Sequence, residues 1–329
     1  MISLPFSIII PVYNDENNIS RCLESVISQS FCNYECLIID DGSTDSTSSL
    51  CDEYSYRDKR IKTFHKKNEG ISKTRQYGID RSQGKYIVFI DSDDWINNFY
   101  IETIYNIITI SEPDIIFFDF YNENIYGLKK HISFNYSSLN SETITMHVLE
   151  GKLSSCLWNI AFKNDFYLKI NIKFNNEINY GEDTLFIIEL LLNNPLVDYI
   201  KKPFYNHTYN INSYTRKNKK NRYFERIKFL HLLPILLKKY NKDNLNKYNF
   251  FPYNDKFTIL CSGVFTKKEY RDFYLLKFTK YHRLNLNIIK YYILYFAENG
   301  FYVLLKHSIS IFYWFNTILH KKIIPNSFI

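Results

Sequence analysis

Short apolar runs alternate with segments of helical periodicity over the first 120 residues. The runs expected to form strands are Phe6–Val12, Tyr34–Ile39, Ile61–Phe64, Tyr86–Ile90 and Asp114–Phe120. Helices are expected between them, at about 16–29, 45–56, 71–81 and 101–110. In the first of these helices, apolar residues recur at i, i+3, i+4, i+7 and i+8, which gives one apolar face. This alternation is typical of an α/β domain in which helices flank a mainly parallel sheet.

The second part of the chain has a different pattern. Periodicity is lost after Tyr121 and returns at Thr143–Leu149 and again at Thr184–Leu192, which we interpret as the second half of the same domain. From residue 216, long helical patterns carry Lys and Arg among Leu, Ile, Tyr and Phe. The sequence therefore predicts an α/β domain over 1–215 and a mostly helical region over 216–329.

Composition narrows the class of protein. The chain has 329 residues, 46% of them hydrophobic and 23% charged, which excludes a disordered chain and a small disulfide scaffold. Its six cysteines form no CxxC pair, so free thiols are expected and a zinc site is not. The N-terminus lacks a basic segment and predicts a first strand instead of a signal peptide. No uncharged apolar stretch reaches the roughly 18 residues that a membrane-spanning helix needs.

Polar residues follow three of the predicted strands directly. Open parallel sheets bind ligands beyond the carboxyl ends of their strands, so these residues are the informative ones. The three segments are Pro11–Glu16, Asp40–Asp45 and Asp91–Trp95. The chain contains neither GxGxxG nor GxxxxGK[ST], the glycine-rich phosphate loops. We therefore expect carboxylates, not backbone amides, to handle the ligand.

The third of these segments predicts a cation site. Asp91, Asp93 and Asp94 place three carboxylates within four residues, and their mutual repulsion is relieved if a cation binds there. Mg²⁺ and Mn²⁺ take oxygen ligands, usually one or two carboxylates with phosphate oxygens and waters. A metal-bound diphosphate is the natural ligand. The alternative, a solvated turn that caps a helix, is disfavoured by the position directly after a buried strand.

The motifs also resemble a known family. The segments SIIIPVYNDENNISRCLESVISQS, LIIDDGSTDST and KNEGISKTRQYGIDRSQGKYIVFIDSDDW are similar to the N-terminal signature of family 2 glycosyltransferases, which have the GT-A fold. Trp158-Asn159 and Tyr180–Phe186 resemble the W-N-K and E-D-T-x-F segments of bacterial members that build surface polysaccharides. The resemblance spans about residues 5–215, and the region from 216 resembles no family that we can name.

The resemblance implies a site for a UDP-sugar donor. Its members are Val12, Tyr13 and Glu16 beside base and ribose, Asp41 bonded to uracil or ribose, and Asn68, Gly70 and Arg75 lining the pocket. They also include Asp93 as ligand of Mn²⁺ or Mg²⁺, Asp91 at the ribose or as a further metal ligand, and Ser92 and Asp94 near the sugar. Gln76 departs from the family pattern, which commonly has Asn at that position.

The same resemblance implies an inverting transfer with a carboxylate base. Asp183 aligns with the catalytic Asp of the E-D segment, and Glu182 would orient or support it. The metal would neutralise the departing diphosphate. Alternatively, the two carboxylates cap the helix that follows, because the helix dipole favours negative charge at its N-terminus. Capping is compatible with catalysis. Tyr205–His207 resembles the family's aromatic segment that closes the donor site, and Arg216 is a candidate to help neutralise diphosphate.

Charge distribution suggests a second role for the C-terminal region. Residues 215–329 carry a net charge of +16 and residues 1–214 a net charge of −9. The segments Arg226–Leu237 and Asn287–Leu319 combine apolar stripes with basic and aromatic residues, which suits a helix at an anionic membrane surface. The alternative is a helical subdomain that packs on the catalytic domain or pairs two protomers. No nucleic-acid-binding motif accompanies the charge, so nucleic acid is not expected as a partner.

Together these features predict a metal-dependent inverting glycosyltransferase. It would move a sugar from a UDP-sugar to a hydroxyl of a lipid-linked or oligosaccharide acceptor in capsule, O-antigen or exopolysaccharide synthesis. We expect it in the cytoplasm, peripheral on the inner face of a bacterial cytoplasmic membrane. A nucleotidyltransferase is the first alternative, although it would want a Gly-rich basic loop after the first strand. A noncatalytic scaffold is the second, and the intact carboxylate set argues against it.

Overall fold

The computed structural model describes residues 4–134, 138–211, 213 and 219–248, with side chains given for most of them. The chain divides into two compact units, Met1–Lys242 and Asp243–Ile329. The segment Asn287–Leu319 and Arg216, both singled out in the sequence, lie outside the described residues. Within the described part of the chain, no helix has both the length and the apolar character required to cross a bilayer.

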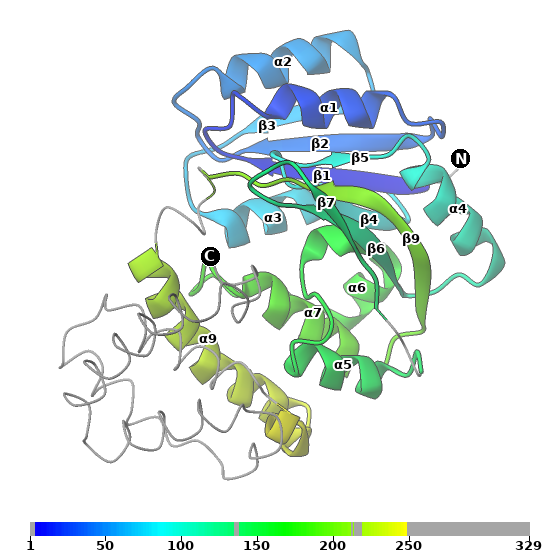
Figure 1. The fold of residues 1–329 in the computed structure, drawn as a ribbon, viewed down its shortest axis with the longest axis vertical. Coiled ribbons are helices and arrows are strands. Elements are labelled where there is room, and N and C mark those ends of the chain that lie inside the picture. The colour runs from blue at the N-terminus through cyan, green and yellow to red at the C-terminus, as the bar shows by residue number, and fades with distance from the viewer. Residues whose placement is uncertain (1–3, 135–137, 212, 214–218, 249–329) are drawn as a thin grey trace, which may run out of the picture. The chain divides into compact units, whose positions relative to one another are not determined.

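The first unit is built on one mixed sheet (Figure 1). Its strands are β1 (Phe6–Val12), β2 (Tyr34–Asp40), β3 (Ile61–His65), β4 (Tyr86–Phe89), β5 (Trp95–Ile96), β6 (Ile115–Glu123), β7 (Lys129–Ile132), β8 (Ile160–Lys163) and β9 (Val197–His207). They lie in the order β3-β2-β1-β4-β8-β6-β9-β5, and β7 pairs with β6. The first four are mutually parallel. Strand β8 runs antiparallel to both neighbours, and β9 is parallel to β6.

Helices cover both faces of this sheet (Figure 1). One face carries α1 (Ile19–Ile27), α2 (Thr47–Arg57) and α4 (Tyr100–Ile110), and the other carries α3 (Ile71–Ile79), α6 (Asn164–Ile170) and α7 (Glu182–Leu192). Two more helices, α5 (Ser141–Leu149) and α9 (Lys219–Lys239), pack against α7. The short 3₁₀ helices are η1 (Leu157–Asn159) and η2 (Asp243–Tyr248). The predicted α/β class is confirmed.

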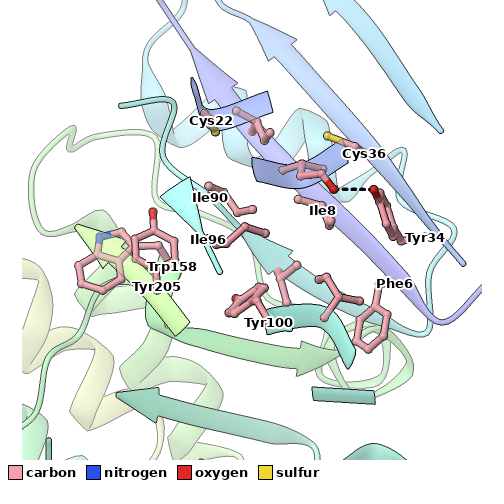
Figure 2. Close-up of a cluster of buried hydrophobic side chains, with 14 of the residues drawn as sticks. Phe6, Ile8, Cys22, Tyr34, Cys36, Ile90, Ile96, Tyr100, Trp158 and Tyr205 are labelled. Carbon is pink, nitrogen blue, oxygen red and sulfur yellow. Dashed lines mark hydrogen bonds between the residues drawn. The ribbon is translucent and has the colours of Figure 1, made fainter. Parts of the chain in front are cut away.

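Alternation along the central strands supplies both halves of the core. Ile8 and Ile10 point into the cluster shared with α1, α2 and α4, part of which Figure 2 shows. Ile9 points the other way, under α3, where a Cβ on Gly78 would lie 2.5 Å from the Ile9 Cγ2 atom. A glycine at this position therefore lets α3 approach the sheet closely. Both faces of β1 are covered, and all of its residues except Ser7 are apolar.

The expected elements of the first 120 residues are present, with small shifts at their ends. Helix α1 begins at Ile19, three residues later than expected, because residues 15–18 form a turn in which Asn18 and Ile19 N–H groups donate to the Asp15 carbonyl. After Tyr121, where periodicity is lost, the sequence predicted two helical segments and no strands. That region contains β7, β8, β9 and α6, which complete the sheet and one helical layer. The predicted boundary at 215 remains a prediction, and the first compact unit includes α9.

Candidate functional site

The polar ends of β1, β2 and β4 meet at one edge of the sheet. Val12 pairs with Asp40 in the parallel register, and the Asp41 N–H donates to the Val12 carbonyl at 2.9 Å. The loop after β4 joins the loop after β1, because Ser92 Oγ donates to Asp15 Oδ2 at 2.5 Å. Arg21 Nη2 donates to the Asp93 carbonyl at 2.6 Å. The structure thus brings together the strand ends that the sequence singled out.

Hydrogen bonds also connect the loops after β1 and β2. Asn14 has a φ of +48°, in the left-handed region, and its N–H donates to Ser43 Oγ at 2.9 Å. Glu16 Oε2 accepts from the Ser46 N–H at 2.9 Å, and Ser46 is the residue directly before α2. Tyr13 lies between these anchored residues and is 49% exposed. Its ring is therefore free to meet a ligand at this edge.

Asp41 fixes the loop that leads into α3. Its buried carboxylate accepts from the Glu69 N–H and the Gly70 N–H, both at 2.9 Å, and from Lys66 Nζ. Gly70 has a φ of +91°, and a Cβ there would lie 2.7 Å from Asn179 Oδ1, so glycine is required twice over. A carboxylate has about four acceptor positions. The described residues use three of them, which leaves one for a ligand.

A buried guanidinium lies at the centre of the site. Arg75 on α3 is 6% exposed, and its Nη1 donates to Glu182 Oε1 at the start of α7. Its Nη2 lies 3.7 Å from Asp91 Oδ1 at the end of β4. Its Nε–H has no partner among the described residues. One cation therefore joins two carboxylates that are far apart in the sequence, with Asp183 in its electrostatic field.

Burial and mutual repulsion shift the acidities of this cluster. Burial, together with the charges of Asp93 and Glu182, raises the pKa of Asp91 to about 6, although Arg75 opposes the shift. Burial and the neighbouring Glu182 raise the pKa of Asp183 to about 7, again against the effect of Arg75. Carboxyl groups with pKa values near neutrality exchange protons readily at physiological pH.

Asp94 is directed into the protein, unlike its neighbours. Its Oδ2 accepts from the Tyr205 hydroxyl and its Oδ1 from the Thr208 N–H, both at 2.7 Å. Tyr205 stacks on Trp158, with ring centroids 4.7 Å apart and planes 13° apart (Figure 2). The Tyr205 oxygen also accepts from the Asp91 N–H at 3.1 Å. Asp94 therefore anchors β9 to the loop after β4, and its predicted contact with a sugar stays a prediction.

Comparison with known proteins identifies the family. The model for "Glycosyl transferase family 2" matches residues 7–168, which include all three polar strand ends. The chain belongs to this family. The resemblance of its motifs is confirmed, and the matched segment ends within α6.

This family 2 chain is similar to named relatives and to a solved structure. It is 41% identical over 118 residues to glycosyltransferase GlyA of Streptococcus pneumoniae, a match that covers 36% of this chain and 17% of the relative. EpsH of Bacillus subtilis is 27% identical over 80% of this chain and 77% of its own length. The crystal structure of S. aureus TarS 1–349 in complex with UDP-GlcNAc has a TM-score of 0.66 and 20% identity, over 82% of this chain and 79% of that chain. This similarity shows the fold, and the predicted GT-A class is confirmed.

Apart from Asp94, which is described above, all but one of the predicted donor-site and catalytic residues of this family 2 chain belong to the polar strand ends or to the ionic cluster. Those within the connected strand ends and the ionic cluster are Val12, Tyr13, Glu16, Asp41, Gly70, Arg75, Asp91, Ser92, Asp93, Glu182 and Asp183. Asn68 is exposed on the loop before α3, where its N–H group would lie 2.9 Å from a Cβ on Gly42. The roles that the resemblance implies for these residues stay predictions.

Several residues of the site escaped the sequence analysis. Lys66, the partner of Asp41, directly follows β3, so extending the strand-end argument to that strand would have found it. Asn210 donates its side-chain N–H to Asp93 Oδ2 at 2.8 Å, and no sequence pattern marks it. Asn159 on η1 is fully buried with both amide atoms unpaired among the described residues. It was noted only as part of the W-N segment.

Proposed function

We propose that this chain transfers a sugar, with inversion, from a UDP-sugar to a hydroxyl of a saccharide acceptor in bacterial surface polysaccharide synthesis. The observation that carries the proposal is the meeting of three polar strand ends at one edge of the sheet, where Arg75 joins Asp91 of one strand end to Glu182, the neighbour of Asp183. The comparisons support it, because GlyA is named a glycosyltransferase and TarS has been crystallised with UDP-GlcNAc and with UDP. We propose a lipid-linked or oligosaccharide acceptor and a cytoplasmic location at the membrane.

The donor nucleotide would bind across the ends of β1 and β2. Tyr13 offers a half-exposed aromatic face to the base. Asp41 has one acceptor position left, which suits the N3–H of uracil or a ribose hydroxyl. The Nε–H of Arg75 is a buried donor without a partner among the described residues, and a phosphate or sugar oxygen would satisfy it.

The carboxylates after β4 fit a hard divalent cation. Asp93 would hold Mn²⁺ or Mg²⁺, with Asp91 as a further ligand, and diphosphate oxygens and waters would complete the shell. Within the described part of the chain, no three His, Cys, Asp or Glu side chains converge into a metal cage, so the proposed cation would depend on oxygen ligands from the substrate and from water. When bound, the ion would stabilise negative charge on the departing diphosphate.

Asp183 is the proposed general base. A carboxylate with a pKa of about 7 takes up a proton more readily than an ordinary Asp. It would accept the proton of the acceptor hydroxyl while that oxygen bonds to the anomeric carbon and the bond from that carbon to the diphosphate breaks. Glu182, bonded to Arg75, keeps the pair in place at the start of α7. A single displacement inverts the anomeric centre, so an α-linked donor gives a β-linked product.

Calorimetric titration with UDP, other nucleotides and Mn²⁺ tests this proposal. We expect binding that is specific for uridine nucleotides and stronger with metal. Asp93→Asn should remove the metal-dependent part, whereas Asp183→Asn should keep UDP affinity and lose turnover. The matched control is Asp165→Asn, because Asp165 is an exposed carboxylate in the first turn of α6. A folded protein that binds no nucleotide would favour the scaffold, and release of pyrophosphate from a triphosphate would favour the nucleotidyltransferase.

A further inference from the structure

The turn between β6 and β7 exposes three large apolar side chains within four residues of sequence. Ile125, Tyr126 and Leu128, here called the apolar tip, are 58%, 78% and 66% exposed. Most other exposed apolar residues of the described part, such as Tyr56 on α2 and Ile110 on α4, stand alone on their elements. Single exposed apolar residues are common on protein surfaces. A cluster of three within four residues marks an interaction site instead.

The fold does not use these side chains. Asn124 Oδ1 accepts from the N–H groups of Tyr126 at 2.9 Å and Leu128 at 3.0 Å. The Asn124 N–H donates to the Leu128 carbonyl, and the Gly127 N–H donates to the Asn124 carbonyl, both at 3.0 Å. Gly127 has a φ of +73°, which completes the turn. Backbone groups and one Asn side chain therefore hold the turn, and the apolar side chains are free for a partner.

The charges next to the apolar tip identify the partner. Residues 123–132 contain Lys129, Lys130 and His131 against one acidic residue, Glu123, which pairs with Lys129. Lys130 is exposed on β7, while Lys129 Nζ lies 4.1 Å from the Trp95 ring centroid. An apolar end with basic residues directly behind it is the arrangement of segments that enter the interface of an anionic bilayer.

The base of the same hairpin is built into the candidate site. Phe120 on β6 packs edge-on against Trp158, with ring centroids 4.6 Å apart. Lys129 Nζ donates to Asn206 Oδ1 at 3.1 Å, two residues before Thr208, whose N–H bonds to Asp94. The apolar tip follows directly on the last pair of this hairpin, Glu123 with Lys129, so it lies at the end of β6 and β7. Interfacial segments reach about 5–10 Å into the lipid headgroup region.

We propose that the apolar tip inserts into the headgroup region of an anionic lipid bilayer and thereby holds the candidate site at the membrane surface. The proposal uses none of the carboxylates assigned to sugar transfer. It rests on the membrane location given in the proposed function, and it can fail while nucleotide binding and sugar transfer hold. It also differs from the prediction for residues 216–329, because the contact is made by the catalytic unit itself.

Vesicle co-sedimentation with the full chain is the first test. Vesicles of phosphatidylcholine alone are compared with vesicles that also contain phosphatidylglycerol. We expect binding to the anionic vesicles, and about tenfold or greater weakening in the triple variant Ile125→Ser, Tyr126→Ser, Leu128→Ser, because three exposed apolar groups lose their lipid contact. The control variant, Tyr56→Ser with Ile110→Ser, should bind as the unmodified chain does. Equal binding by the triple variant, or equal loss in the control, overturns the proposal.

A second measurement works even if the C-terminal region also binds lipid. p-Benzoylphenylalanine replaces Tyr126 in one variant and Tyr56 in another, and each protein is irradiated on anionic vesicles. A lipid adduct at position 126 and not at 56 supports the proposal. Adducts at neither position, or an adduct joining two copies of the chain through position 126, overturn it. UDP titration of each variant is compared with that of the unmodified chain. A different UDP affinity shows that the substitution altered the candidate site.

Discussion

Replacing Arg75 by methionine removes the one cation that joins the ends of β4 and α7 while keeping a long side chain in its place. Arg75 is 6% exposed and bonds to Glu182, itself buried, and lies 3.7 Å from Asp91. Removing one partner of a buried ion pair costs about 3–5 kcal/mol, because the other charge is left unpaired. For a unit of this size, about 1 kcal/mol corresponds to a change of about 2–4 °C in Tm. We therefore expect Tm to fall by about 6–20 °C.

Differential scanning calorimetry at pH 8 and pH 5.5 measures this loss. The loss should be smaller at pH 5.5, because without Arg75 the raised pKa values of Asp91 and Asp183 rise further and these carboxyls stay neutral there. Lys73→Met is the matched control on α3, since Lys73 makes only an exposed pair with Glu69, worth less than about 1 kcal/mol. If Arg75→Met loses no more stability than Lys73→Met, the buried cluster does not have the energetic role described.

Three further predictions address separate parts of the unit. The turnover of the unmodified chain should fall on the acid side of about pH 7 as Asp183 becomes protonated; a pH–rate profile flat across this range would move the base elsewhere. Gly84→Ala should destabilise the unit by about 1–3 kcal/mol in urea unfolding, because its Cβ would lie 2.2 Å from the Ser7 nitrogen, and an unchanged midpoint would contradict this packing. The hydrogen bond with Asp40 raises the pKa of His65. The protonated His65 therefore stabilises the folded chain fully below about pH 6.5, and this contribution is lost as pH rises through the raised pKa. His65→Gln should make the urea unfolding midpoint depend less on pH over this range, and an unchanged pH dependence would refute this reasoning.

The parallel half of the sheet was predictable because burial on both faces makes its strands continuous apolar runs. The run Phe6–Val12 matches β1 at both ends. Strand β9 was missed, since Lys201, Lys202 and Pro203 interrupt its pattern. These residues form an irregularity in pairing, where Phe118 pairs with Ile200 but Phe120 pairs with Tyr205. Such an irregularity depends on the neighbouring strand and leaves no fixed period in the sequence.

Some site residues were predictable from the local sequence, whereas their contacts depend on tertiary structure. Asp41 and Asp91 were predictable as site residues, because the end of a buried parallel strand fixes where the next residues lie. Arg75 was assigned to the pocket only through the resemblance, and its pairing with Glu182 was not foreseen. These two residues are 107 positions apart, and their pairing depends on how the fold brings the start of α7 to Arg75. The burial of Asp94 was likewise unforeseen, since its partners lie on and just beyond β9.

The charge balance of the site bears on how a donor would enter it. The buried guanidinium of Arg75 faces Asp91, Glu182 and Asp183, Asp93 adds a further negative charge, and the exposed guanidinium of Arg21 bonds to the Asp93 carbonyl. A diphosphate brought into this surrounding adds negative charge that Arg75, already bonded to Glu182, cannot balance alone. The diphosphate should therefore bind together with its divalent ion. Uridine, which carries no phosphate, should bind with an affinity that Mn²⁺ leaves unchanged, whereas UDP should gain affinity. Equal gains for both ligands in calorimetry would mean that the ion acts on the protein and not on the diphosphate.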